Sequence, residues 1–210
     1  MKTETEHIRI NELKWNKWAR DLDSNGWRYR YLRRVQGALI SILDVKEGIS
    51  FLDVGCGTGW AVGRAAELVN DHGMFYGIDL SFKMIEKAKV HFQDRKNLQF
   101  IKSNVESIPL RDNFFNIIIC TNSFHHYLNP GSALKEMHRL LKRGGRVYIL
   151  DPTADTWLIK VIDRIMGGFE PAHVKLYSSK EFRDLFAGAG LGYVTTKSID
   201  PHQKVHVGEK

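Results

Sequence analysis

Short apolar runs alternate with helix-like patterns through the middle of the chain. Residues 49–54 form an apolar run that ends in glycines, which is typical of a buried parallel strand. Apolar residues at helical spacing follow over 58–70, and residues 74–78 predict a second strand. The same alternation predicts helices over 81–96, with Ser81 as N-cap, and from 129 to the glycines at 144–145, and strands over 98–101, 114–120 and 146–150. Such strand–helix–strand units predict a parallel sheet with helices on both faces.

Two further segments flank this core. Residues 1–46 are rich in aromatic residues and predict a helical N-terminal cap, while residues 47–152 form the ligand-binding core. Residues 153–177 predict an amphipathic helix, with Leu158, Val161, Ile162 and Ile165 on its apolar side. Residues 178–210 predict a helix and two strands, 192–198 and 204–207, that pair antiparallel. We therefore expect one α/β domain over 1–210: a Rossmann-like, doubly wound, mixed sheet of seven strands, mostly parallel with an antiparallel C-terminal strand.

Composition places the chain among ordinary globular proteins. It has 43% apolar and 26% charged residues over 210 positions. Cys56 and Cys120 form no disulfide framework, and the polar N-terminus is unlike a signal peptide. The longest apolar run, 114–120, is too short to cross a bilayer. A cytoplasmic location fits these features.

The net charge of +7 leaves two interpretations of one basic stretch. Arginines and aromatic residues alternate from Arg28 to Arg34. Such a stretch is typical of a solvated helix face, and it also suits an anionic partner such as RNA.

The most informative stretch is the glycine loop over 52–59, Leu-Asp-Val-Gly-Cys-Gly-Thr-Gly. It ends the first strand and opens a helix, where doubly wound sheets bind ligands, and Asp79 ends the second strand, where a carboxylate accepts hydrogen bonds from ribose. A nicotinamide dinucleotide suits the loop poorly, because Trp60 or Val62 stands where its fingerprint needs a small residue. Asp53 would repel a pyrophosphate and favour a cationic cofactor, such as a sulfonium with an ammonium group.

In five stretches the sequence resembles the class I S-adenosylmethionine-dependent methyltransferases, especially the small-molecule branch of ubiquinone/menaquinone methyltransferases (methyltransferase type 11). These stretches are 52–59, 77–81, 104–110, 114–127 and 140–145. The resemblance implies S-adenosylmethionine as cofactor. It implies that the methionine part contacts Asp53, Gly55, Cys56, Gly57 and Gly59, and that the ribose contacts Asp79. It further implies that the adenine contacts Leu80, Met84, Asn104 and Val105, and that the rest of the site wall is formed by Thr121, Asn122 and Ser123. Asn104 stands where the family commonly has an aspartate, which we expect to weaken binding without abolishing it.

His125 and His126 are the candidate catalytic residues, because they follow the fourth strand beside the expected site. A histidine can take a proton from a phenol, a thiol or an acidic carbon as the methyl group arrives. The alternative is that one ring packs in the core and the other beside the cofactor. The sequence shows no metal-ligand spacing, so no metal site is predicted.

We expect in-line methyl transfer to a small-molecule acceptor, apolar or aromatic. Residues of the two flanking segments are candidates to line its pocket, namely Trp18, Tyr31, Trp157, Met166 and Phe169. Three alternatives stay open: an RNA or protein acceptor, a non-catalytic protein that binds S-adenosylmethionine, and a helix around Trp157 that lies on a membrane surface. Nucleic acid is the less favoured partner, and the oligomeric state is not predicted.

Overall fold

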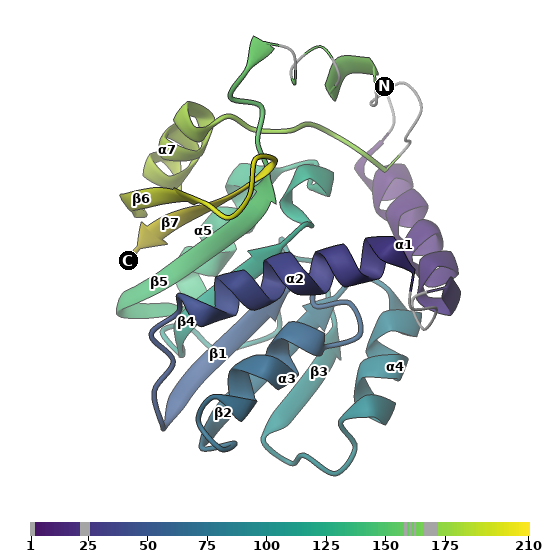
Figure 1. Cartoon of the computed structure of the whole chain (residues 1–210), viewed down its shortest axis with the longest axis vertical. Helices are drawn as coiled ribbons and strands as arrows, with labels where there is room; N and C mark the ends of the chain where they lie inside the picture. Colours follow the sequence, from purple (N-terminus) through teal and green to yellow (C-terminus); the bar gives the residue numbers. More distant parts are fainter. Residues whose placement is uncertain (1–2, 22–25, 158, 160, 162, 166–171) are drawn as a thin grey trace.

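Seven strands form one mixed sheet (Figure 1). The computed structural model describes residues 3–21, 26–157, 159, 161, 163–165 and 172–210. In chain order the strands are β1 (Ile49–Val54), β2 (Gly73–Asp79), β3 (Leu98–Lys102), β4 (Phe115–Thr121), β5 (Leu141–Pro152), β6 (Gly192–Ser198) and β7 (Gln203–Glu209). Across the sheet their order is β3-β2-β1-β4-β5-β7-β6, and β7 runs antiparallel to both β5 and β6 while the other pairs are parallel. The predicted fold class and its antiparallel C-terminal strand are confirmed.

Helices cover both faces of this sheet (Figure 1). Their bounds are α1 (Glu4–Asp21), α2 (Trp27–Ser41), α3 (Trp60–Glu67), α4 (Phe82–His91), α5 (Pro130–Leu140) and α7 (Ser179–Gly188), with a short 3₁₀ helix, η1 (Phe124–His126), after β4. Buried side chains of α2, α3 and α4 share one core with the sheet, and those of α5 and α7 share the other. The helix α1 stands beside α4 at one side of the molecule.

The two cores follow from the alternation of side chains along each strand. Phe51 of β1 points into the first core and its neighbour Leu52 into the second, and both are fully buried. Ile117 and Ile118 of β4 divide in the same way. Successive side chains of a strand point to opposite faces, so a sheet covered on both sides needs continuous apolar runs.

The helix predicted over 81–96 is shorter than expected. Ser81 is the N-cap, as predicted, since its Oγ accepts a hydrogen bond from the backbone N of Met84. The helix ends at His91, however, and Val90 is 66% exposed. Val90 lies two residues after the buried Ala88, on the opposite side of the helix.

The glycines at 144–145 do not end the preceding helix, contrary to the prediction. Helix α5 ends at Leu140, and β5 begins at Leu141, which pairs with Phe115 of β4 and is fully buried. Packing of Leu141 in the sheet thus ends the helix before the glycines are reached. Gly144 instead takes a positive φ of 73° inside the strand.

The two described residues of the apolar side predicted for the segment 153–177, Val161 and Ile165, are not part of the core. The described residues between 157 and 165 are helical, yet Val161 and Ile165 are 48% and 56% exposed. Leu158 and Ile162, the other two residues of the predicted apolar side, lie outside the described residues. The helical period is therefore right, but the face that it assigned to the core is wrong for Val161 and Ile165.

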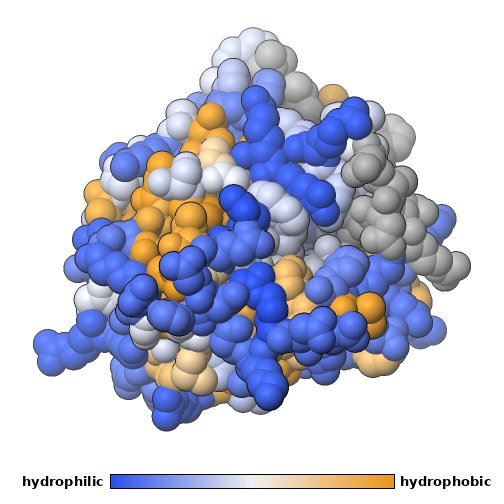
Figure 2. Space-filling view, turned by 60° about the horizontal axis from the view of Figure 1, so that its bottom comes forward, coloured by the Kyte–Doolittle hydropathy of each residue, from blue (hydrophilic) through white to orange (hydrophobic). Residues whose placement is uncertain are grey.

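Hydrophilic side chains dominate the face shown in Figure 2, with apolar residues gathered mainly on one side. Among the described helices, none combines the length and the apolar character that a bilayer span requires.

Candidate functional site

The glycine loop lies between β1 and α3, where the strand order reverses from β2 to β4. Gly55, Gly57 and Gly59 all have positive φ, at 77°, 54° and 83°. A Cβ at position 55 would also lie 2.4 Å from Oγ of Ser123, in the loop after β4. Glycine at 55 therefore permits both the left-handed backbone and the close approach of the two loops.

Asp79 fastens this loop to the start of α4. Its Oδ2 accepts a hydrogen bond from the backbone N of Gly57 at 2.9 Å, and its Oδ1 accepts one from the backbone N of Ser81 at 2.8 Å. Burial raises the pKa of Asp79 to about 6, and the backbone donors, Ser81 foremost, oppose that rise. The carboxylate is therefore ionised at neutral pH and suited to accept hydrogen bonds from hydroxyl groups.

Asp53 is the most unusual carboxyl group in the described part of the chain. It is fully buried at the end of β1, and neither of its oxygens has a hydrogen-bond partner. Burial, and secondarily the charge of Asp79, raise the pKa of Asp53 to about 8. An unpartnered buried carboxyl is costly, and a nearby cation would offset that cost. This site therefore fits a cofactor that carries positive charge.

Replacing Asp53 with Ala is expected to stabilise the ligand-free protein by roughly 5 kcal/mol more at pH 8 than near pH 4, at about 1.4 kcal/mol for each pH unit between the folded and unfolded pKa values. Because the folded pKa of about 8 lies above the ordinary value of 3.8, the unfolded carboxyl loses its proton first. Stability of the wild type therefore falls as pH rises between these values, and the loss is complete above pH 8. Denaturant unfolding of both proteins across this range measures the difference. The exposed Asp44→Ala serves as control and should give a difference that does not change with pH, whereas destabilisation of Asp53→Ala at pH 8 would contradict the assignment.

A pocket of about 340 Å³ opens beside the glycine loop. All the predicted cofactor residues line it except Asp53 and Gly59; those that do are Gly55, Cys56, Gly57, Asp79, Leu80, Met84, Asn104, Val105, Thr121, Asn122 and Ser123. Asp53 is fully buried at the end of β1, and its charge is little screened there by solvent. Gly59 is required for packing, since a Cβ there would lie 2.7 Å from the ring of Phe100.

Polar side chains on the pocket wall are held by neighbouring elements. Gln36 of α2 donates to Oγ1 of Thr121 at 2.8 Å, and Gln203 of β7 donates to Oδ1 of Asn122 at 2.7 Å. The side-chain oxygen of Asn104 accepts a hydrogen bond from the backbone N of Glu106 at 3.2 Å. This bond occupies one of the two lone pairs of the Asn104 amide oxygen within its own turn.

His125 lines the same pocket and is held by Asp151. Its Nδ1 lies 3.0 and 3.1 Å from the two carboxylate oxygens of Asp151, and its backbone N donates to Oδ2 of Asp151 at 2.9 Å. Asp151, on β5, is fully buried. A carboxylate that accepts from Nδ1 fixes the ring and leaves Nε2 with a free lone pair.

His126 lies beside it in a different environment. Its Nδ1 donates to the backbone O of Ala172 at 2.9 Å, and Trp15 of α1 packs edge-on against its ring at 5.1 Å. Burial, followed by the charges of His125 and Lys14, lowers the pKa of His126 to about 2. His126 is therefore neutral at physiological pH and a weak base.

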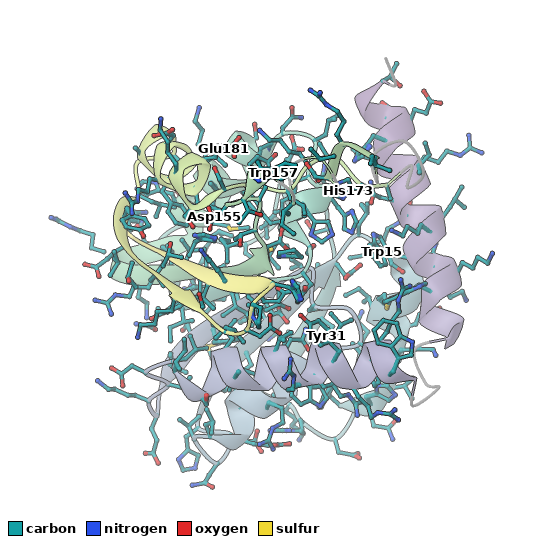
Figure 3. The ribbon with its side chains drawn as sticks, turned by 45° about the horizontal axis from the view of Figure 1, so that its top comes forward. Trp15, Tyr31, Asp155, Trp157, His173 and Glu181 are labelled. Atoms are coloured by element: carbon teal, nitrogen blue, oxygen red, sulfur yellow. The ribbon has the colours of Figure 1, made fainter. Side chains whose placement is uncertain are left out.

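A third histidine, which the sequence analysis missed, completes a cluster with this pair. One ring nitrogen of His173 lies within 4.8 Å of a ring nitrogen of His125 and of His126. His173 is seen in Figure 3 on the side of the molecule where α1 stands. No spacing along the chain could have shown this cluster, because His173 follows the pair by more than forty residues.

Aromatic side chains from the N-terminal helices, from α3 and from the segment after η1 also line the pocket. Trp18 lines the pocket as predicted, and the lining aromatic residues that sequence analysis missed are Trp15, Tyr29, Trp60 and Tyr127. Tyr31 does not line it and donates instead to Asp200 at 3.0 Å, and Trp157 is 77% exposed, so both predictions are wrong (Figure 3). Met166 and Phe169 lie outside the described residues. Aromatic character marked these residues, but it does not say which way a side chain points.

The chain is similar to known methyltransferases in sequence and structure. A family model described as a methyltransferase domain matches residues 52–149. Demethylmenaquinone methyltransferase of Bacillus mycoides is 31% identical over 179 residues, which cover 74% of this chain and 75% of that protein. Three other curated relatives are matched over only 41% to 62% of their own length.

Solved structures agree with this assignment. A chain in the complex of the Haloferax volcanii Trm112 methyltransferase activator with a methyltransferase matches with a TM-score of 0.80 at 21% identity, over 93% of this chain and 96% of that one. YcgJ of Bacillus subtilis matches with a TM-score of 0.70 at 25% identity, over 79% and 71%. On the fold, the glycine loop and these relatives together, the chain belongs to the class I S-adenosylmethionine-dependent methyltransferase family.

Proposed function

We propose that this chain transfers the methyl group of S-adenosylmethionine to a small-molecule acceptor of apolar or aromatic character. One observation carries the proposal: a single pocket is lined both by the glycine loop and Asp79 and by His125 and His126. Methyl transfer needs cofactor and acceptor in line within one enclosed space. When bound, S-adenosylmethionine supplies an electrophilic methyl group on a sulfonium.

The chain's own residues have separate roles in this proposal. Asp79 accepts hydrogen bonds from the ribose, and Asp53 stabilises the positive charge of the methionine part from the end of β1. His125, held by Asp151, acts on the nucleophilic atom of the acceptor, and His126 positions the acceptor. With no metal bound, His125 acts as a base, and its Nε2 takes the proton from the methyl-accepting substrate.

The pocket wall favours an aromatic acceptor. Half-buried Trp15 and Trp18 of α1 pack edge-to-face, with ring centroids 5.5 Å apart, and both line the pocket. Among the relatives, the demethylmenaquinone methyltransferases act on a quinone-type substrate, as their name states. We therefore propose a planar ring that carries a hydroxyl group, such as a hydroquinone.

The RNA alternative is less well supported. Arg33 stacks on Tyr29 at 3.9 Å and Arg34 pairs with Asp200 at 3.0 Å, so part of the basic stretch serves the fold of the chain itself. We also propose a cytoplasmic location, because Cys56 and Cys120 are both buried free thiols.

The rate at which S-adenosylhomocysteine forms from S-adenosylmethionine tests the proposal directly. We expect reduced demethylmenaquinone or a simpler hydroquinone to raise this rate at least tenfold above the rate without acceptor. A panel of phenols, thiols and acidic carbon compounds compares the other acceptor classes. If S-adenosylhomocysteine binds but no acceptor raises the rate at which it forms, the chain is a non-catalytic cofactor-binding protein and the proposal fails.

A further inference from the structure

Three histidines from two parts of the chain lie close together, and two of them line the pocket. His125 and His126 belong to η1, and His173 precedes α7. Their ring centroids lie 3.9 Å apart for the first pair, and 5.7 and 6.4 Å from that of His173. One ring nitrogen of each lies within 4.8 Å of the other two. Three imidazoles so close together offer lone pairs to a cation.

An oxygen acceptor holds one nitrogen of each ring. Asp151 holds Nδ1 of His125 and the backbone O of Ala172 holds Nδ1 of His126. Asp163 lies 2.6 Å from Nε2 of His173. Metal-binding histidines almost always donate their second N–H to a carboxylate or carbonyl in this way, which fixes the tautomer and leaves the opposite nitrogen for the metal. Each of the three rings shows this arrangement.

Burial and chemistry favour a transition metal over an alkali or alkaline-earth ion. The side chains of His173 and His125 are 4% and 15% exposed. Neutral imidazole is a preferred ligand of zinc, copper, nickel and iron, whereas magnesium and calcium prefer oxygen. Zinc–nitrogen bonds of about 2.0–2.1 Å place ligand nitrogens roughly 3.4 Å apart, so the rings need to approach by at most about 1.5 Å.

We propose that His125, His126 and His173 bind one divalent transition metal ion of the zinc class. Three histidines leave a fourth coordination position, as in zinc enzymes that bind water or substrate there. His125 and His126 line the pocket whereas His173 does not, so the open position faces the pocket.

The consequence for catalysis rests on the proposed function. A hydroxyl or thiol of the acceptor at the open position releases its proton to solvent more readily, because the metal stabilises the anion. The anion then forms a bond to the methyl carbon as the carbon–sulfur bond of the sulfonium breaks, which leaves methylated acceptor, S-adenosylhomocysteine and one proton. A coordinated His125 cannot accept a proton, so the metal replaces it in that role.

Zinc titration of tag-free, EDTA-stripped protein, by competition with a chromophoric chelator, tests the metal site. We expect one zinc per chain with a dissociation constant in the micromolar range or below. His173→Ala should weaken binding at least thirtyfold and Asp163→Asn about tenfold, since loss of a partner behind the ligand costs 10–100-fold in affinity. His202→Ala, at an exposed histidine, is the matched control and should bind zinc as the wild type does.

S-adenosylhomocysteine binding, measured on every variant, separates this inference from the proposed function. Intact binding in His173→Ala shows that the variant folds, and His173→Asn provides a second variant of similar polarity. Absence of zinc binding, or equal binding in wild type and His173→Ala, overturns the metal site while leaving the methyltransferase proposal standing. Loss of S-adenosylhomocysteine binding by the wild type would overturn the proposed function instead, whatever zinc does.

Discussion

Asp79→Ala is expected to weaken S-adenosylhomocysteine binding about a hundredfold at pH 7.5, equivalent to about 2.7 kcal/mol. The substitution removes the acceptor for the ribose hydroxyls. It also frees the backbone N of Gly57, which Asp79 holds at 2.9 Å, so the glycine loop loses one of its hydrogen bonds to β2. The backbone N atoms of Gly55 and Cys56 still donate to the backbone O of Ile78. Hydrogen bonds to a charged group contribute about 1.5–3 kcal/mol each, which accounts for the size of the effect. Calorimetric titration measures it.

Two comparisons make the Asp79 result specific. Asp79→Asn keeps one acceptor oxygen and should lie between wild type and Asp79→Ala, while the exposed Asp94→Ala should bind normally. Because the pKa of Asp79 is raised to about 6, wild-type affinity should fall as pH drops below that value, and Asp79→Ala should show no such fall. Equal affinity of wild type and Asp79→Ala would remove Asp79 from the cofactor site.

The double variant His125→Ala with His126→Ala is expected to lower the turnover rate at least a hundredfold. Groups that transfer protons at an active site typically contribute 10²–10⁴-fold, and both side chains line the pocket. Affinity for S-adenosylhomocysteine should change less than threefold, because neither histidine is among the residues proposed to bind the cofactor. Steady-state turnover beside calorimetry separates the two effects.

The single variants assign the roles. His125→Ala should lower turnover more than His126→Ala, since Asp151 orients His125 whereas His126 packs against Trp15. Asp151→Asn should lower turnover without changing cofactor affinity, because it acts only through the orientation of His125. Turnover unchanged in the double variant would end the catalytic proposal for both histidines.

Strand positions were predictable because each strand carries its own apolar signal. The predicted range 49–54 is β1 itself, and 192–198 is β6 itself. Element ends were less predictable where distant packing decides them. Leu141 continues a helical pattern in the sequence, yet its pairing with Phe115 makes it the first residue of β5.

The residues predicted to contact the cofactor mostly line one pocket, and short spacings along the chain made that grouping predictable. The glycine loop and Asp79 end adjacent parallel strands, so local sequence already brings them together. His173, Asp151 and Trp15 come near His125 and His126 only through folding. The sequence around these residues carries no pattern that predicts this proximity. Trp157 and Tyr31 show the converse, since their aromatic character suggested a pocket that neither side chain lines.

The central claim is that this pocket holds S-adenosylmethionine, and one calorimetric comparison tests it most directly. Wild-type protein is titrated with S-adenosylhomocysteine and, separately, with NAD, and Asp53→Ala is titrated with both. The account predicts stoichiometric binding of S-adenosylhomocysteine by the wild type, at least tenfold weaker binding by Asp53→Ala, and no response to NAD. Binding of NAD without any response to S-adenosylhomocysteine would contradict it.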